Sequence, residues 1–393
     1  MVQDSRIVIR VGFVLTFDAT TWLGGVSYFR NLLRALRDLP HPRIEPVVFA
    51  GEGTDAAMLE QFQAVFTIRS PILDAGSPAW TVRRAVAKLC GRDVGLERLL
   101  RRHGVQALSH QGFFGSLGRI PVLGWIPDFQ ERHLPDFFSP VELEARARKR
   151  SLFCRVCSSV ILSSRDAQRD LEALDQRCPA KSKVLHFVAD VIAPSEAASG
   201  EVELRLGIER PYFHLPNQFW NHKNHAVVVE ALRLLRERGV NAQVVATGNS
   251  TDHRQPWYFD SLMRRIIDAG VEDRFSITGT VAYEELFALM SGAVAVINPS
   301  RFEGWSTTVE EAKSLGKMVL LSDLAVHREQ APKRSWYFPP DNAEALAAGM
   351  EATLESYNPG VEREAVREAQ AALPDRRRAF ATAYEDIVLE AAA

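Results

Sequence analysis

The sequence predicts an α/β protein with two Rossmann-like, doubly wound domains that face a cleft. The chain has 393 residues, which at about 150 residues per domain leaves room for two or three domains. Short β-rich apolar runs alternate with longer amphipathic stretches in two separate series, and this alternation is typical of parallel sheets flanked by helices. The break lies near Ala189–Glu201, where Ala193–Ser195 and Ala198–Gly200 have the composition of a linker. We therefore expect domains at residues 1–195 and 196–375.

Each apolar run is interpreted as a strand and each amphipathic stretch as a helix. In the first half the expected strands are Ile7–Leu15, Pro46–Ala50, Val105–Ser109, Val122–Ile126, Val160–Ser163 and Lys183–Phe187. In the second half they are Pro211–Leu215, Ala242–Thr247, Arg274–Thr278, Ala293–Asn298 and Lys317–Ser322. The periodicity predicts helices over Val26–Asp38, Ala226–Arg238 and Tyr258–Ala269. Because such sheets bind ligands beyond the carboxyl ends of their strands, the residues that follow strands are the first candidates for function.

Composition and charge exclude several classes of protein. Lys and Arg number 47 and Asp and Glu number 49, which gives a net charge of −2, whereas a dedicated nucleic-acid binder carries a basic excess. A hydrophobic content of 46% and a charged content of 24% exclude a disordered chain. No apolar run approaches the roughly 20 residues that span a bilayer. We interpret the N-terminal apolar stretch as a buried strand and not as a signal peptide.

The four cysteines are too few for a disulfide scaffold, so the cytoplasm is the expected location. Cys154 and Cys157 have C-x-x-C spacing, but no second Cys or His pair completes a zinc site. We expect them to be core residues and not a redox or metal motif. The sequence contains neither H-E-x-x-H nor paired C-x-x-C, so we predict no catalytic metal.

The strongest local signal follows the expected strand Ala293–Asn298. Glu303 lies in the strand-to-helix loop and Glu311 in the first turns of the next helix. Between them, Gly304–Thr307 offers backbone N–H groups and hydroxyls at a helix N-terminus, which favours a phosphate. A carboxylate beside a phosphate needs a reason, such as binding sugar hydroxyls. The alternative is that both glutamates only cap the helix and complement its dipole.

Two further strand ends carry candidate ligand-binding residues. Lys223 follows the strand Pro211–Leu215 and can neutralise a diphosphate leaving group, although a solvated loop lysine is the alternative. Gly248 directly follows the strand Ala242–Thr247, where it either borders a nucleotide or forms a simple turn. Gly24 and Gly25 follow the first strand, where they either let a ligand approach a helix N-terminus or form an ordinary loop.

Basic side chains gather in two segments. Arg83–Arg102 contains seven Lys or Arg residues, and Arg146, Arg148, Lys149 and Arg150 form a second cluster. Both segments could contact anionic lipid headgroups or a lipid-diphosphate acceptor. The alternative is a solvated helix face.

Glu303 and Glu311, two glutamates separated by seven residues after Pro-Ser and followed by Ala-x-x-x-Gly, resemble the E-x7-E motif of retaining GT-B glycosyltransferases of family 4. Asn217–His225 resembles the segment that opens the donor domain, where a lysine meets the donor diphosphate. Thr278–Val281 and Ser322–Glu329 are similar to the stretches before and after the motif. The resemblance is dense from about residue 211 to 341. In the first half it depends mainly on Gly24-Gly25 and on Trp125-Ile126-Pro127-Asp128.

This resemblance implies a GT-B fold and transfer of a hexose, with retention, from a nucleotide diphosphate sugar to a hydroxyl acceptor. The acceptor would be a glycan or lipid-linked glycan of cell-surface polysaccharide or glycoconjugate biosynthesis. No cofactor is implied beyond the nucleotide sugar itself. The first domain would face the acceptor, the second would bind the donor, and a helix at residues 376–393 would pack back on the first domain.

The resemblance also assigns roles to residues. Glu303 would contact the donor sugar and stabilise positive charge at the anomeric carbon, Lys223 would meet the diphosphate, and Asp128 would act near the acceptor. Two positions depart from the family, which usually has an arginine at Gln218 and a histidine at Pro127. The predicted donor-binding residues are Gln218, Gly304, Trp305, Ser306, Thr307, Glu311, Gly248 and Gly25. The predicted acceptor-side residues are Gly24, His110 and His133.

Two other functions are compatible with the same motifs. One is a nucleotide-sugar epimerase or hydrolase on the same architecture. The other is a non-catalytic nucleotide-sugar-binding subunit, in which the missing arginine and histidine are signs of lost activity. The motifs do not identify the base or the sugar of the donor, because pocket shape decides both.

Overall fold

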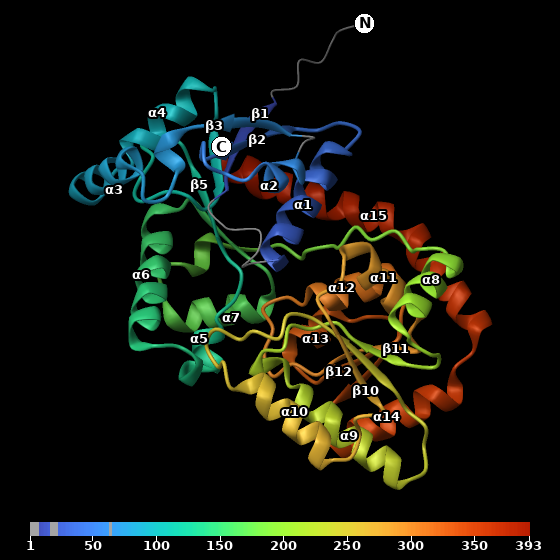
Figure 1. Cartoon of the computed structure of the whole chain (residues 1–393). Helices are drawn as coiled ribbons and strands as arrows, with labels where there is room; N and C mark the ends of the chain where they lie inside the picture. The colour runs from blue at the N-terminus through green and yellow to red at the C-terminus, as the bar shows by residue number, and fades with distance from the viewer. Residues whose placement is uncertain (1–7, 16–22, 63–64) are drawn as a thin grey trace, which may run out of the picture. The chain divides into compact units, whose positions relative to one another are not determined.

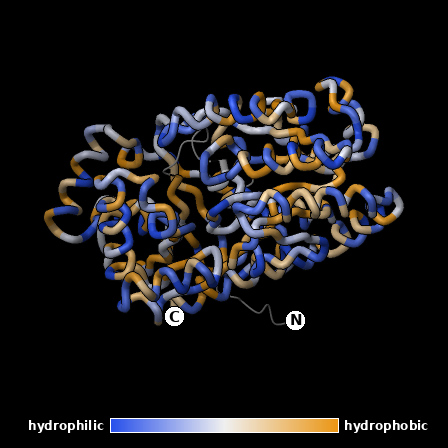
Figure 2. Tube along the Cα trace, turned by 90° about the horizontal axis from the view of Figure 1, so that it is seen from below, coloured by the Kyte–Doolittle hydropathy of each residue, from blue (hydrophilic) through white to orange (hydrophobic). Residues whose placement is uncertain are grey.

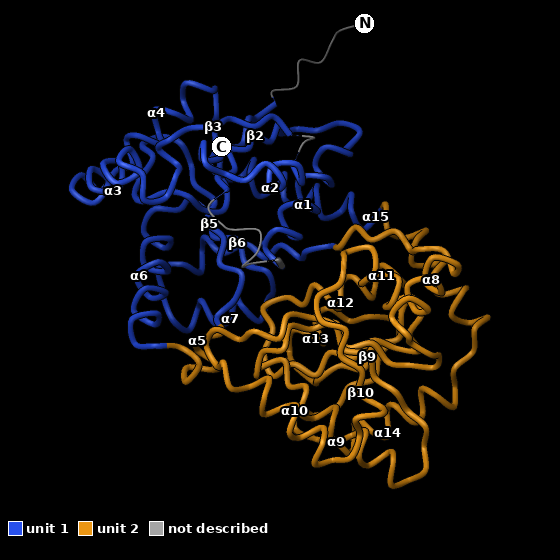
Figure 3. Tube along the Cα trace, in the orientation of Figure 1, with its two compact units in different colours: residues 1–129, 139–188, 375–393 blue, residues 130–138, 189–374 orange. Residues whose placement is uncertain are grey.

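The computed structural model describes residues 8–15, 23–62 and 65–393. In these residues the strands form one seven-stranded and one six-stranded sheet, and helices connect them (Figure 1). The chain divides into two compact units (Figure 3). Unit 1 comprises residues 1–129, 139–188 and 375–393, and unit 2 comprises residues 130–138 and 189–374. The predicted α/β class, with two Rossmann-like doubly wound sheets, is confirmed.

The sheet of unit 1 is parallel and has the strand order β3-β2-β1-β4-β5-β6-β7. Its strands are β1 (Ile9–Val14), β2 (Ile44–Ala50), β3 (Phe66–Arg69), β4 (Ala107–His110), β5 (Val122–Ile126), β6 (Ser159–Leu162) and β7 (Ser182–Val184). Its helices are α1 (Leu23–Arg37), α2 (Ala56–Glu60), α3 (Pro78–Cys90), α4 (Val94–Arg102), α6 (Pro140–Val156) and α7 (Arg165–Leu174). The strand order reverses between β1 and β4.

The sheet of unit 2 is also parallel and has the order β10-β9-β8-β11-β12-β13. Its strands are β8 (Phe213–Leu215), β9 (Val244–Thr247), β10 (Phe275–Gly279), β11 (Ala295–Asn298), β12 (Val319–Ser322) and β13 (Ser335–Phe338). Its helices are α5 (Gln130–His133), α8 (Glu196–Leu206), α9 (His225–Glu237), α10 (Tyr258–Asp268), α11 (Tyr283–Gly292), α12 (Thr307–Ser314), α13 (Ala325–Gln330) and α14 (Ala343–Ser356). Here the order reverses between β8 and β11, so their carboxyl ends form the expected ligand-binding edge.

Burial explains why these residues form strands. All four residues of β9, β11 and β12 are buried, as expected for parallel strands that helices cover on both faces. Along the helices, hydrophobic stretches are interspersed with hydrophilic ones (Figure 2), as expected for helices that pack with one face. Each of the eleven expected strands overlaps an observed strand. The structure adds β3 and β13, two edge strands that keep exposed positions and therefore lack a continuous apolar run.

The expected linker is only partly correct. Residues 189–195 have no regular structure, but Ala198–Gly200 lies inside α8, which Ser195 caps through its side chain. The long C-terminal helix α15 (Pro359–Ala392) belongs to unit 1 from Asp375 onward. There Glu385 accepts hydrogen bonds from the backbone and side chain of Arg43, at 2.7 and 2.9 Å.

Cys154 and Cys157 are buried, as predicted for core residues, and Cys178, which follows α7, is buried too. Cys154 forms a disulfide with Cys178, 24 residues further along the chain, and Cys157 is free. The C-x-x-C spacing therefore does not correspond to a bonded pair, and the observed partner was not predicted. Among the described residues, no helix combines the length and the apolar character needed to cross a membrane.

A buried ion pair holds α3 and α4 together. Arg83 lies on α3, and Asp93 is the N-cap of α4, accepting a hydrogen bond from Leu96 N. The Arg83 Nη2 atom lies 2.7 Å from Asp93 Oδ2, and Arg83 Nε lies 2.9 Å from Oδ1. Asp93 also accepts a hydrogen bond from the Phe114 amide. α3 buries only Arg83 and Ala87, so this ion pair is one of its few buried contacts, beside the edge-to-face contact of Trp80 with Phe114.

We expect Asp93→Ala to lower the free energy of unfolding of unit 1 by about 3–5 kcal/mol, because it leaves the buried Arg83 guanidinium without its carboxylate partner. Urea unfolding measures the effect. Asp386→Ala is the control, since Asp386 pairs with Arg43 at the surface and its loss should change the free energy by less than about 1 kcal/mol. Equal effects of the two substitutions would contradict the proposed anchoring.

Candidate active site

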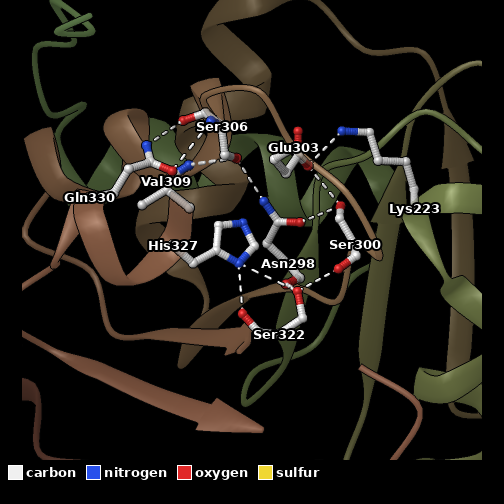
Figure 4. A network of polar contacts seen from close by, with 9 residues as sticks. All are labelled: Lys223, Asn298, Ser300, Glu303, Ser306, Val309, Ser322, His327 and Gln330. Atoms are coloured by element: carbon white, nitrogen blue, oxygen red, sulfur yellow. Dashed lines mark hydrogen bonds and ion pairs between the residues drawn. The ribbon is translucent and has the colours of Figure 1, made fainter. Parts of the chain in front are cut away.

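Lys223 and Glu303 lie side by side at the carboxyl edge of the sheet of unit 2 (Figure 4). Lys223 ends a short 3-10 helix between β8 and α9, and Glu303 lies between β11 and α12. Because β8 and β11 are neighbours in the sheet, residues 80 positions apart in sequence meet there, with Lys223 Nζ 2.7 Å from Glu303 Oε1. Only 15% of the Lys223 side chain and 10% of the Glu303 side chain are exposed. The pair occupies the reversal point of the strand order, where doubly wound sheets bind ligands.

A hydrogen-bond network holds the Glu303 carboxylate in place (Figure 4). Ser300 Oγ lies 2.7 Å from Glu303 Oε1 and 2.8 Å from Asn298 Oδ1. Asn298 Nδ2 donates to Ser306 Oγ over 2.7 Å, and Ser306 Oγ also accepts from the Val309 amide at the start of α12. The network thus connects the end of β11 to the first turn of α12.

Residues of α13 and β12 complete this network. Gln330 Oε1 accepts from Ser306 N, and Gln330 Nε2 donates to Ser306 O over 2.9 Å. His327 Nδ1 lies 2.8 Å from the carbonyl oxygen of Ser322, so the neutral ring carries its proton on Nδ1. Both the hydroxyl and the amide of Ser306 are therefore engaged. Ser306 acts as a helix cap, and its predicted contact with a diphosphate stays a prediction.

The electrostatics of the site keep Glu303 ionised. Burial alone would raise the pKa of Glu303. The positive charge of Lys223, the nearby His327 and the hydrogen bond from Ser300 outweigh burial and hold the pKa of this carboxyl below its usual value. Burial lowers the pKa of His327, so its ring is neutral near pH 7. Lys223 is thus the cation that stabilises the Glu303 carboxylate.

The connection after β8, which contains Gln218, contacts the connection after β9, which contains Gly248. Gln218 Oε1 accepts from the Asn249 amide over 2.8 Å, so the NH2 group of Gln218 is the part that can meet a ligand. Gly248 has a φ of +152°, and a Cβ atom there would lie 2.4 Å from Asn217 O. The close approach of the two connections therefore requires glycine at position 248.

The other predicted donor-binding residues lie near α12. Gly304 and Trp305 are half-buried in the same connection as Glu303, and Thr307 is the first residue of α12. Glu311 is buried one turn further along α12. Its expected hydrogen bonds to ribose hydroxyls stay a prediction.

Three of the predicted residues of unit 1 lie in α1 or at the end of β4. Gly24 and Gly25 lie in the first turn of α1, which begins at Leu23 and not near Val26, and the preceding residues 16–22 are outside the described part of the chain. His110 is fully buried, with Nε2 2.9 Å from Tyr28 Oη, and burial lowers its pKa to about 3. We therefore no longer assign His110 to the acceptor.

Asp128 and His133 differ in the unit to which they belong. Asp128 follows β5 in unit 1 and pairs with Arg146 of α6, with 3.4 Å between Oδ1 and Nη1. His133 ends α5 in unit 2, where its exposed ring lies 5.1 Å from the ring of Phe302. His133 therefore packs against the residue that precedes Glu303, and it stays an acceptor candidate.

Sequence reasoning missed the residues that support the ion pair, namely Asn298, Ser300, Ser322, His327 and Gln330. Ser300 and the segment Ser322–Glu329 contributed to the resemblance, but no role was predicted for them. A signal was available at Asn298, where a buried polar residue ends an apolar strand and requires a hydrogen-bond partner.

The part of the chain that contains this site resembles a known protein family. Residues 204–371 match the model of the family described as glycosyl transferases group 1. The match covers less than half of the chain and shows that this part of it is similar to the group 1 glycosyl transferases. Lys223, Glu303 and the network around them all lie within the matched residues, and the predicted family is confirmed.

Two curated relatives of this group 1 domain are distant. Mannosylfructose-phosphate synthase of Agrobacterium fabrum is 22% identical over 204 residues, which are 49% of this chain and 44% of that protein. The O-antigen chain mannosyltransferase RfbU of Salmonella typhimurium is 25% identical over 139 residues, which are 35% and 37% of the two chains. The chain therefore matches less than half of the length of either relative.

Solved structures extend the likeness to the whole chain. HepE of Anabaena, in complex with UDP and glucose, superposes with a TM-score of 0.70 at 17% identity, covering 97% of this chain and 99% of HepE. A glycosyltransferase of Rickettsia africae superposes with a TM-score of 0.68 at 15% identity, covering 98% of each chain. At these identities the likeness shows the fold, and the predicted GT-B fold is confirmed.

We expect Lys223→Met to lower the free energy of unfolding by about 3 kcal/mol at pH 7, because it leaves a buried carboxylate without its cation. In the double variant with Glu303→Gln the loss should be smaller than the sum of the single losses. Thermal and urea unfolding of the wild type, the two single variants and the double variant measure this double-mutant cycle. An additive result would show that the two side chains do not interact.

The same pair should make stability depend on pH. The pKa of Glu303 is below its usual value of 4.5, so the stabilisation is complete above that value and is lost as the pH falls through the lower pKa of the folded protein. Glu303→Gln should remove this acid-dependent part of the unfolding profile. An unchanged profile in Glu303→Gln would mean that other carboxylates cause the pH dependence.

Proposed function

We propose that the protein is a retaining glycosyltransferase that moves a hexose from a nucleotide diphosphate sugar to a hydroxyl acceptor. The observation that carries the proposal is the ion pair between Lys223 and Glu303 at the reversal point of the sheet of unit 2. An ammonium group there can bind a diphosphate, and a fixed carboxylate can face a developing positive charge. The similarity of residues 204–371 to the group 1 glycosyl transferases supports the same reaction.

In the proposed reaction Lys223 exchanges partners. A donor diphosphate carries more negative charge than one carboxylate, so it attracts the Lys223 ammonium away from Glu303. Glu303 then keeps its hydrogen bond from Ser300 and becomes free to interact with the sugar. When the bond between the anomeric carbon and the diphosphate lengthens, Glu303 stabilises the positive charge on the carbon and Lys223 stabilises the negative charge on the leaving group.

The donor and pathway are inferred from the named relatives. HepE has been solved with UDP and glucose, so UDP-hexoses are the first donors to test. Both curated relatives carry mannose in their names, and one of them acts on O-antigen chains. We therefore infer a glycan or lipid-linked glycan acceptor in the synthesis of cell-surface polysaccharide or glycoconjugate.

Glu303→Gln and Lys223→Met should each reduce transfer about 100- to 1000-fold, as the loss of one charge-stabilising group typically does. The chain offers a matched control in a second buried lysine–glutamate pair, Lys317 and Glu362, whose atoms Nζ and Oε2 lie 3.1 Å apart. Lys317 precedes β12, so this pair lies at the opposite edge of the sheet.

Glu362→Gln should therefore lower stability but leave the rate of transfer per folded molecule unchanged. Sugar release is measured with and without an acceptor, and the anomeric configuration of the product is read by NMR. Full activity in either site variant, or an equal loss in the control, would contradict the proposal. Sugar release that needs no acceptor would instead indicate an epimerase or hydrolase, and binding without turnover a non-catalytic subunit.

Nucleotides should stabilise the protein according to their phosphate content. Donor at 100 times its dissociation constant should add about 2.7 kcal/mol to the free energy of unfolding. Because Lys223 is assigned to the diphosphate, UDP should raise the melting temperature more than UMP, and Lys223→Met should remove that difference. Screening UDP-, GDP- and dTDP-sugars identifies the base. Equal shifts with UDP and UMP would mean that Lys223 does not contact the phosphates.

A further inference from the structure

His327 has an unused hydrogen-bond acceptor in the network around the Lys223–Glu303 pair. Its side chain is fully buried, and Nδ1 lies 2.8 Å from the carbonyl oxygen of Ser322. Because this contact fixes the proton of the neutral ring on Nδ1, the lone pair of Nε2 is available as an acceptor. Among the residues that the structure describes, no group forms a hydrogen bond with Nε2. Buried polar atoms without a partner are uncommon, so this nitrogen needs an explanation.

The ring is turned toward the ion pair. In Figure 4 one ring nitrogen faces Ser322, and the other points to the side on which Asn298 and Glu303 lie. The backbone of His327 is held as well, since the Tyr337 hydroxyl donates to its carbonyl oxygen over 3.3 Å. A proton added to Nε2 would leave the contact with Ser322 in place, because Nδ1 already carries a proton.

Three charged groups act on the His327 ring. Burial lowers the pKa of the ring most, the charge of Lys223 lowers it further, and Glu303 and Asp323 act in the opposite direction. Asp323 pairs with Arg328 at 2.7 Å, which reduces its influence. Burial and Lys223 together therefore keep His327 neutral beside the Glu303 carboxylate.

Helix α12, which packs against α13, brings one further carboxylate toward α13. Glu310 accepts a hydrogen bond from Gln330 of α13 over 3.2 Å. Its charge is balanced by Lys313, with 2.8 Å between Nζ and Oε1. Lys223 is therefore the charge near His327 that a bound diphosphate would draw away.

We propose that His327 is a positioning residue that replaces Lys223 as the cationic partner of Glu303 when the donor binds. This inference rests on the proposed function, in which the diphosphate attracts Lys223 away from the carboxylate. Nε2 then takes one proton from the solvent, and no other bond forms or breaks. A buried carboxylate without a cation is costly, so the new charge keeps Glu303 ionised and in place. Donor binding is thereby coupled to the uptake of one proton.

The coupling makes donor affinity depend on pH in one direction. In the free protein the pKa of His327 lies below its usual value of 6.5, and in the complex the departure of the Lys223 charge raises it. Between these two values the complex holds one proton more than the free protein. The dissociation constant of the donor should therefore increase about tenfold for each pH unit in that range.

A test that needs no donor uses Lys223→Met, which removes the cation permanently, with Lys223→Gln as the second variant if the first does not fold. NMR of the imidazole rings, titrated from about pH 8 to about pH 6, reports the protonation of each histidine. His327 should stay neutral in the wild type, gain a proton in the Lys223 variant, and be neutral again when Glu303→Gln is added. His327→Gln assigns the signal.

His214 is the internal control for this titration. It is fully buried on β8, its Nε2 atom lies 3.1 Å from Thr247 Oγ1, and burial lowers its pKa to about 3. Its ring should stay neutral in all of these proteins. A His327 ring that stays neutral in the Lys223 variant would overturn the proposal, because Glu303 would then take the proton itself.

Calorimetry in two buffers of different ionisation enthalpy counts the protons taken up on donor binding. The probe is UDP-glucose, or the nucleotide sugar that the thermal screen selects, because its diesterified phosphates hold no proton near neutral pH. The wild type should take up close to one proton. His327→Gln should take up none and lose the pH dependence of the dissociation constant, whereas His214→Gln should keep both.

The outcomes separate this inference from the proposed function. Donor binding that needs Lys223 but takes up no proton would overturn the role of His327 and leave the proposed reaction intact. Donor binding that Lys223→Met does not weaken would contradict the exchange of partners in the proposed reaction, and with it the role of His327 in donor binding.

Discussion

The ion pair between Lys223 and Glu303 depends on one topological constraint, the reversal of strand order between β8 and β11. Strands on either side of that reversal send their connections to opposite faces of the sheet, which leaves an open edge between them. A lysine and a glutamate placed in those two connections meet across the edge at 2.7 Å. Because both side chains are largely buried at this edge, each charge requires the other as its partner.

This mutual dependence links stability to function. Ser300, Asn298 and Ser306 keep the Glu303 carboxylate fixed from the protein side, so Lys223 is the partner that can leave. In the proposed reaction a diphosphate takes the place of Glu303 as the anion that faces Lys223. The contact between Lys223 and the diphosphate then replaces the stabilisation that the ion pair provides. The Glu303 carboxylate is already oriented when the sugar arrives.

The sequence predicted the alternation of elements well because buried parallel strands are continuous apolar runs. It missed β3 and β13, since edge strands such as Phe66–Arg69 stay partly exposed and lose that signal. Lys223 and Glu303 could be predicted from their positions after strands and from the resemblance, but not their contact, because it depends on which strands are neighbours. His110 was misjudged because burial and a hydrogen bond with Tyr28, which the sequence does not display, engage its ring. The basic count over Arg83–Arg102 likewise included Arg83, whose charge Asp93 neutralises inside unit 1.

A crystal structure of the protein with a bound nucleoside diphosphate tests the exchange of partners most directly. We expect Lys223 Nζ to lie within hydrogen-bonding distance of a phosphate oxygen and to have left Glu303 Oε1, while Ser300 still contacts the carboxylate. A diphosphate bound elsewhere, with the contact between Lys223 and Glu303 intact, would contradict it.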